Sequence, residues 1–160
     1  MGIGTTAPLE KFEVAGRMRS SNLVRTISAS NRIFASCNGR CPFQTMPNMS
    51  LSINTGNVPL LILGQVGGIL TGCTAANIDL FVDGSSVDHQ GTQAGFDQNS
   101  NPIIVSTTLM SVQSLAPGSH TIEIDWNADS FNCGGPGTAE ASFFDSTRSL
   151  TVVELAGTQQ

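Results

Sequence analysis

Two carboxylates two residues apart are the best catalytic candidates in the sequence. Glu123 and Asp125 lie on one face of an alternating segment, at a spacing close to that of the two carboxyl groups of a glycoside hydrolase. Such enzymes usually hold sugar rings against aromatic side chains, but the chain has no Tyr and a single Trp. That residue, Trp126, belongs to the opposite face of the segment. We therefore expect the two carboxylates to lie on a solvated strand face without a catalytic role.

Serine and cysteine chemistry have no better support. The sequence lacks the G-x-S-x-G nucleophile elbow, and the neighbours Ser119 and His120 would point to opposite faces of a strand. A cysteine nucleophile would need a free thiol near His89 or His120, the two histidines of the chain. We predict that the chain is not an enzyme.

Metal chemistry is weakly indicated as well. Asp83, Ser85 and Asp88 could supply oxygen ligands to calcium, but the segment lacks the spacing and the terminal Glu of an EF-hand. Asp-Gly at its start is a strong signal for a hairpin turn. The cysteines contain no C-x-x-C pair, which excludes the common zinc patterns. We expect a plain turn, no bound metal and no other cofactor.

The four cysteines are candidates for disulfides: Cys37, Cys41, Cys73 and Cys133. They allow three pairings, and buried thiols are the alternative. A bond between the first two would close a tight loop around Asn-Gly. It would leave a second bond across a long loop, worth about 4 kcal/mol in the chain-entropy estimate. The Asn-Gly-Arg within the tight loop resembles short receptor-binding peptides, but it also suits a turn, and we expect only the turn.

The composition excludes several classes of protein. Only 12% of the 160 residues are charged, about half the usual share, which argues against a coiled coil. The hydrophobic share of 39% and the net charge of -5 argue against a disordered chain. Seven basic residues against twelve acidic ones argue against binding to nucleic acid. The most apolar stretch, 58–70, is too short and too rich in glycine to insert into a membrane.

Alternating apolar and polar residues predict an all-β fold. About ten short antiparallel strands, separated by Gly, Pro and Asn turns, are typical of a jelly-roll-like sandwich. Near the C-terminus Val153 and Leu155 fall out of phase, which predicts a bulge or a strand covered on both faces. The positions expected to face inward are Met49, Leu51, Ile53, Ile78, Leu80, Val82, Ile122, Ile124, Trp126, Ala139, Ala141, Phe143, Leu150 and Val152.

The chain is expected to comprise an extended N-terminal arm (1–20), a sandwich head (21–157) and a short tail (158–160). The polar segment 87–101 is predicted to be an exposed loop. It supplies the candidate recognition residues His89, Gln90, Gln93, Asp97, Gln98 and Asn99.

The first residues carry a motif: Gly2, Ile3, Gly4, Thr5, Pro8, Lys11, Phe12, Val14 and Gly16. It resembles a motif of phage tail fibres and related bacterial fibre proteins, with Phe12 where Leu is usual. The resemblance covers only the arm, and it implies a trimeric, interwoven shaft. The runs 78–84, 115–122 and 148–155, with Trp126, give the rest of the chain a weaker resemblance to trimeric heads of the C1q/TNF-like or fibre-knob kind.

These resemblances imply a structural and recognition protein. The leading hypothesis is the homotrimeric head of a phage tail fibre or similar appendage that binds a cell-surface glycan or protein. One alternative is a self-assembling virion decoration or extracellular filament whose arm donates a strand. The other is a lectin or carbohydrate-active enzyme. The cysteines suggest an extracellular protein and the first residues show no signal peptide; a virion-associated protein, or a fragment of a longer secreted one, would satisfy both observations.

Overall fold

Every regular element of the computed structural model is a β-strand in the part of the chain that it describes, residues 2–3, 13–14, 24–37, 42–72, 75–92, 104–129, 137–142 and 146–155. No helix in these ranges is long and apolar enough to cross a membrane. The strands are β1 (Gly2–Ile3), β2 (Glu13–Val14), β3 (Val24–Ala29), β4 (Ile33–Cys37), β5 (Gln44–Thr55), β6 (Pro59–Gly72), β7 (Ala75–Val82), β8 (Ser85–Thr92), β9 (Val105–Ser114), β10 (Gly118–Asp129), β11 (Gly137–Ala141) and β12 (Arg148–Glu154).

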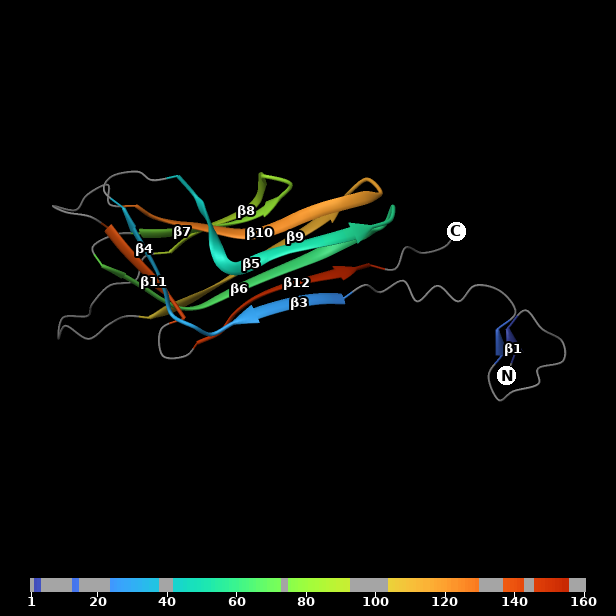
Figure 1. Cartoon of the computed structure of the whole chain (residues 1–160), viewed down its shortest axis with the longest axis horizontal. Coiled ribbons are helices and arrows are strands. Elements are labelled where there is room, and N and C mark those ends of the chain that lie inside the picture. Colours follow the sequence, from blue (N-terminus) through green and yellow to red (C-terminus); the bar gives the residue numbers. More distant parts are fainter. Residues whose placement is uncertain are drawn as a thin grey trace.

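Ten of these strands form two antiparallel sheets that lie face to face (Figure 1). The first sheet has the order β5-β10-β7-β8. In the second sheet the long strand β6 pairs with β9 along one edge and with β12 along the other. Outside β12 lies β3, while β11 and β4 extend the same sheet beyond them.

In the second sheet β11 and β12 together occupy the place of one interrupted strand, and β4 and β3 together occupy the place of another. β11 and β12 both pair with β6, and Gly67 of β6 joins them: its N–H donates to Thr147 O over 3.0 Å, and its carbonyl accepts from Ser142 N over 3.0 Å. β4 and β3 pair in turn with β11 and β12. The sandwich is therefore a four-on-four arrangement.

The strand order identifies a jelly roll. When each interrupted strand is counted once, eight strands alternate between the sheets along the chain, except that β7 and β8 form a hairpin within one sheet. Two four-stranded antiparallel sheets linked by crossings of this kind are the jelly-roll architecture. The predicted all-β, jelly-roll-like sandwich is confirmed.

The core lies between the sheets, where the alternating patterns predicted it. Trp126, Ile122 and Ile124 of β10 are almost completely buried, and Leu150 and Val152 of β12 face them from the other sheet. Each such side chain stabilises the fold by about 1.5–3 kcal/mol through removal of apolar surface from water. Of the predicted inward positions only Leu51 is partly exposed, and Phe143 lies outside the described residues.

The prediction of an exposed loop over 87–101 is wrong for residues 87–92, because β8 continues to Thr92 and pairs with β7. Residues 93–101 lie outside the described residues. Of the two alternatives predicted for Val153 and Leu155, the bulge is absent, since β12 pairs regularly with both neighbours from Arg148 onward. Val153 lies partly buried on the outer face.

The irregularities occur elsewhere. Met46 and Met49 are both buried although they are three residues apart, so β5 must break its alternation between them. It does so with Asn48 at a φ of 63° and a register shift against β10. In β6 a second shift lies between Val66 and Ile69, with Gly68 at a φ of 63°.

A buried arginine connects these irregularities. Arg148 is completely buried and donates five hydrogen bonds, one for each of its N–H groups. They reach Asn31 between β3 and β4, Pro47 at the bulge of β5, and Ser142 at the end of β11, over 2.7 to 3.2 Å. The side chain thus replaces the regular backbone pairing that these segments lack.

Part of the predicted arm and of the disulfide set lies outside the described residues. Within the arm, Gly2 and Ile3 pair in parallel with Glu13 and Val14. Of the cysteines, only the backbone of Cys37 is described, at the end of β4. The predicted residues outside the described ranges are Gly4, Thr5, Pro8, Lys11, Phe12, Gly16, Cys41, Cys73, Gln93, Asp97, Gln98, Asn99 and Cys133. The division into arm, head and tail and the disulfide pairing stay predictions.

Candidate recognition site

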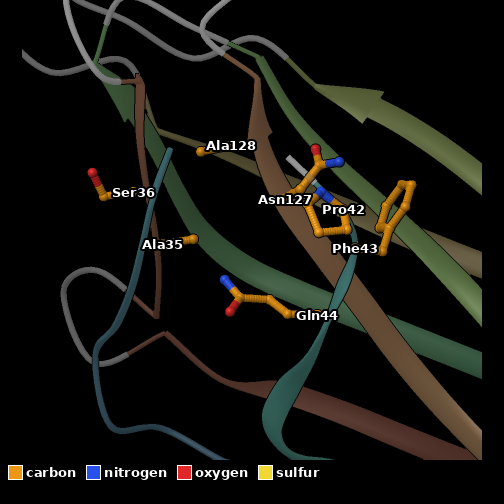
Figure 2. Close-up of a pocket in the computed structure, with 7 residues that line it drawn as sticks. All are labelled: Ala35, Ser36, Pro42, Phe43, Gln44, Asn127 and Ala128. Atoms are coloured by element: carbon orange, nitrogen blue, oxygen red, sulfur yellow. The ribbon is translucent and has the colours of Figure 1, made fainter. Parts of the chain in front are cut away.

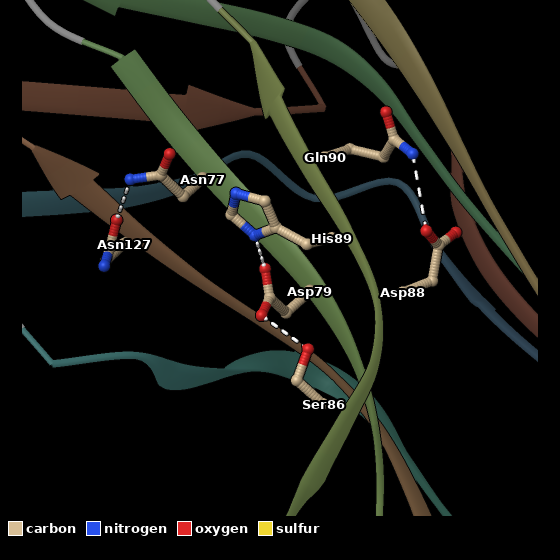
Figure 3. A network of polar contacts seen from close by, with 7 residues as sticks. All are labelled: Asn77, Asp79, Ser86, Asp88, His89, Gln90 and Asn127. Atoms are coloured by element: carbon tan, nitrogen blue, oxygen red, sulfur yellow. Dashed lines mark hydrogen bonds and ion pairs between the residues drawn. The ribbon is translucent and has the colours of Figure 1, made fainter.

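The outer face of the first sheet carries a row of polar side chains. In the strand register Asp79 of β7 stands between Asp125 of β10 and His89 of β8. Asp79 is only 5% exposed, accepts a hydrogen bond from Ser86 Oγ over 2.8 Å, and pairs through its other oxygen with His89 Nδ1 (Figure 3). Side chains of β7 and β8 are thus held in fixed positions on this face.

Aromatic rings lie beside this polar row. Phe43, just before β5, packs against Phe81 with ring centroids 5.9 Å apart, and against the His89 ring at 6.3 Å in an edge-on orientation. Phe81 follows Asp79 by two residues and so shares its face. Alternation along β7 accounts for the position of Phe81, but no sequence pattern predicts that of Phe43, because the backbone ahead of β5 brings that ring into place.

Asp125 is the electrostatically perturbed member of the row. Burial raises its pKa, the negative charges of Glu123 and Asp79 raise it further, and a hydrogen bond with Thr45 opposes the shift. Its Oδ1 atom is buried and has no hydrogen-bond partner among the described residues. A protonated carboxyl group is therefore favoured here more than at an ordinary surface position.

Asp125→Asn is expected to stabilise the fold at neutral pH by a few tenths of a kcal/mol to about 1 kcal/mol, because it removes a charge directly opposite Asp79. Since the folded state raises the pKa of Asp125, its carboxyl costs stability progressively as the pH rises above the ordinary value of 3.8, and the full cost is reached above the raised folded pKa. Urea unfolding at pH 7 and pH 4 measures the effect. The gain should be smaller at pH 4, close to that ordinary value, and an equal gain at both pH values would contradict the explanation.

A pocket of about 210 Å³ adjoins the aromatic rings, where the ends of β4 and β10 meet the start of β5 (Figure 2). Its described lining contains no charged side chain and consists of Ala35, Ser36, Pro42, Phe43, Gln44, Asn127 and Ala128. The Gln44 side chain extends toward β4 (Figure 2). Asn127 connects the pocket to the polar row, since its Oδ1 accepts from Asn77 Nδ2 over 2.8 Å.

The other residues singled out for chemistry have structural partners. Glu123 accepts from Ser50 Oγ over 2.8 Å. Asp83 and Gly84 have φ values of 50° and 76° and form the tight turn between β7 and β8, which confirms the predicted hairpin. Asp88 accepts from the Met110 backbone N–H over 2.8 Å. No group of three His, Cys, Asp or Glu residues in the described ranges is placed to hold a metal.

His120 forms a clasp between two turns. Its Nδ1 lies 2.7 Å from Asp83 Oδ2 and its Nε2 lies 2.8 Å from Ala116 O, and only the protonated ring can donate to both. The bond to Asp83 is the largest cause that raises the pKa of His120, and the same bond lowers the pKa of Asp83.

This clasp predicts a pH dependence of stability. The contribution of His120 is complete below its ordinary value of 6.5 and is lost as the pH rises through the raised folded pKa. That of Asp83 is complete above 3.8 and is lost as the pH falls through the lowered folded pKa. The difference in free energy of unfolding between wild type and His120→Gln should be largest between these values and shrink toward alkaline pH. A difference that does not vary with pH would exclude the charged clasp.

Comparison with known proteins supplies no close relative. No family model and no curated protein matches the chain. Among solved structures, the infectious bursal disease virus VP2 subviral particle matches at 18% identity and a TM-score of 0.39, over 96% of this chain and 42% of that one. The Eiger TNF of S. frugiperda matches at 10% identity and a TM-score of 0.35, over 81% and 96% of the two chains. A family two carbohydrate esterase from Cellvibrio japonicus matches at 16% identity and a TM-score of 0.29, over 84% of this chain and 34% of that one. The similarities are low, and the fold assignment rests on the strand order.

Proposed function

We propose that the chain is a non-enzymatic structural and recognition module. It forms the self-assembling head or tip of a phage tail fibre or similar extracellular or virion-associated appendage, and it binds a cell-surface glycan or protein. The observation that carries the recognition part is the fixed row of Asp79, His89 and Ser86 beside the Phe43 and Phe81 rings. Hydrogen-bonding groups held next to apolar rings are the usual composition of a ligand site.

The hydrogen bonds of this row favour binding over catalysis. In a serine triad the imidazole accepts the serine proton, yet Ser86 donates to the carboxylate of Asp79, a weaker base that also pairs with His89. His89 thus contacts the carboxylate on its Nδ1 side and has no part in activating the serine. Asp79 orients both neighbours and presents them to a ligand.

A matched pair of phenylalanine variants tests this proposal. The full chain is applied to a glycan array and to whole bacterial cells, with Phe43→Ala compared with Phe34→Ala. Phe34 is 68% exposed on β4 in the other sheet. We expect Phe43→Ala to weaken binding by about 5- to 30-fold, since loss of an aromatic contact costs on the order of 1–2 kcal/mol, while Phe34→Ala binds normally. Equal binding by both variants, or no binding by wild type, would overturn the proposal.

A carbohydrate-active enzyme is the second candidate, because Asp125 has a raised pKa and lies two residues from Glu123 on the same face. Incubation of glycans bound on the array with the protein, followed by a reducing-sugar assay, separates the two. The recognition module releases no sugar. Release that is lost in both Glu123→Gln and Asp125→Asn would establish the enzyme instead.

A purely architectural role, as a virion decoration or a filament subunit, is distinguished by negative-stain imaging. Discrete closed particles support the head or tip of an appendage. Open-ended fibres would support the architectural role.

A further inference from the structure

The outer face of the second sheet carries an apolar row that crosses four strands. The strand register places Val112, Leu61, Val153 and Val24 directly opposite one another, on β9, β6, β12 and β3. Met110 and Leu63 form the start of the next row. Three of these side chains are more than half exposed, at 62% for Met110, 59% for Val112 and 55% for Val24. Apolar side chains that gather on one face in this way indicate an interaction surface.

The part of this face formed by β9, β6, β12 and β3 is free of charge: its twelve outward positions, three on each strand, contain only Val, Leu, Met, Thr, Ser and Gln. The ion pair of Glu140 with Arg32 lies farther along the same sheet, on the β11 side. The outer face of the other sheet, by contrast, carries Asp79, Glu123 and Asp125. The Oγ atoms of Thr26 and Thr151 lie 3.0 Å apart, so hydroxyls on this face bond to one another. The two outer faces of the sandwich therefore suit different partners.

The absence of charge on this part of the face favours a second copy of the chain as the partner. Two copies that each carry -5 repel one another, and the repulsion is least where the meeting surfaces hold no charge. A basic partner would instead be attracted to the acidic face. A patch of uncharged apolar side chains can also be self-complementary about a two-fold axis, as a symmetric pair of identical chains requires.

We propose that a second copy of this chain docks on the outer face of β9-β6-β12-β3. The inference rests on the assembly part of the proposed function and is independent of the ligand. Sheets that pack face to face lie about 10 Å apart, so the exposed Met110 and Val112 side chains would interdigitate with the facing copy. A hollow of about 320 Å³ on this face, lined in part by Leu63, Gln65 and Thr108, offers a place for such a side chain.

The area of this face sets the expected affinity between two copies. Strands about 4.8 Å apart with outward residues about 6.7 Å apart give each position roughly 32 Å², so twelve positions cover about 400 Å² of sheet plane. A stable interface buries about 800 Å² per partner, with protruding side chains included. We therefore expect a reversible contact rather than an obligate one.

Sedimentation velocity of the full chain between about 1 and 200 µM tests the proposal, because contacts of this size are typically micromolar. Wild type is expected to form a larger species as its concentration rises. Val112→Glu should raise the dissociation constant at least tenfold without lowering the unfolding midpoint, because the side chain is 59% exposed. The control, Asn54→Glu, adds the same charge at an exposed position of β5 in the first sheet and should associate normally.

Mixing variants gives the decisive result. Val112→Glu and Val112→Lys should each be monomeric, and their mixture should associate, since opposite charges then meet on facing copies. Wild type that stays monomeric throughout, or Val112→Glu that associates like Asn54→Glu, would overturn the proposal. The glycan array is repeated with monomeric Val112→Glu. If each protomer still binds its glycan, recognition does not depend on assembly. Failure of one proposal is then distinguishable from failure of the other.

Discussion

Arg148→Met is expected to lower the free energy of unfolding by about 3 kcal/mol. Methionine fills much of the same space but donates no hydrogen bond, so the carbonyls of Asn31 and Pro47 and the hydroxyl of Ser142 lose their donors. Leaving a buried acceptor without its partner costs about 1–3 kcal/mol for each group that water cannot reach. Asn31 and Pro47 belong to exposed residues, and water will satisfy part of the loss.

Desolvation of the arginine charge opposes this loss, so the sign of the measured change in unfolding free energy is informative. Burial lowers the pKa of Arg148, which shows that the folded state disfavours its charge, and removal of that charge relieves some desolvation. Replacement of buried charged groups by apolar ones is neutral or stabilising in some proteins. We expect a net loss here because the arginine holds three irregular backbone segments together. A Met variant as stable as wild type would show that desolvation outweighs these hydrogen bonds.

Urea unfolding of two further variants controls the comparison. Arg25→Met removes an exposed arginine from β3 and should change stability by less than about 0.5 kcal/mol. Arg148→Lys keeps the charge but lacks the planar fork of five donors, and it should lose stability as well. If the lysine variant matched wild type, charge alone would account for the role of Arg148.

Local alternation explains why so much of the core was predictable. Successive side chains of a strand point to opposite faces, so alternate residues share a face. Ile122, Ile124 and Trp126 could therefore be assigned inward from the sequence alone. The Asp83-Gly84 turn was predictable for the same reason, since its backbone angles depend on two adjacent residues. Arg148 lies two residues before Leu150 and four before Val152, so alternation places its side chain on the same inward face. This spacing is the sequence signal for its burial.

The candidate site depends on information that no local pattern contains. Asp79, His89 and Phe43 come from three separate segments, and only the strand order places them together. The length of β8 was also missed, because Asp88, His89 and Gln90 are polar residues that suit a loop as well as an edge strand. Similarly, the row of Val24, Val153, Leu61 and Val112 exists only once the register of four strands is known.

Gly67→Ala should be the second most destabilising of these changes, at about 1–3 kcal/mol, the usual cost of overpacking. An added Cβ atom would lie 2.8 Å from the Thr147 carbonyl oxygen, which is backbone and cannot rotate away. The same oxygen accepts the Gly67 N–H, so the clash would push β6 from β12 where they already depart from regular pairing. Gly56→Ala is the matched control, because nothing lies within 4 Å of its added Cβ atom.

The double variant Arg148→Met/Gly67→Ala links the two predictions. Gly67 bonds to Ser142 and Thr147, and Arg148 bonds to Ser142, so both residues stabilise the same interruption between β11 and β12. Changes that share a partner are not additive, and coupling of about 0.5–3 kcal/mol is typical. We expect the double variant to lose less than the sum of the single losses, because an interruption loosened by one change has less left to lose through the other. Additive losses in urea unfolding would mean that the glycine contact and the arginine hydrogen bonds stabilise the fold independently of one another.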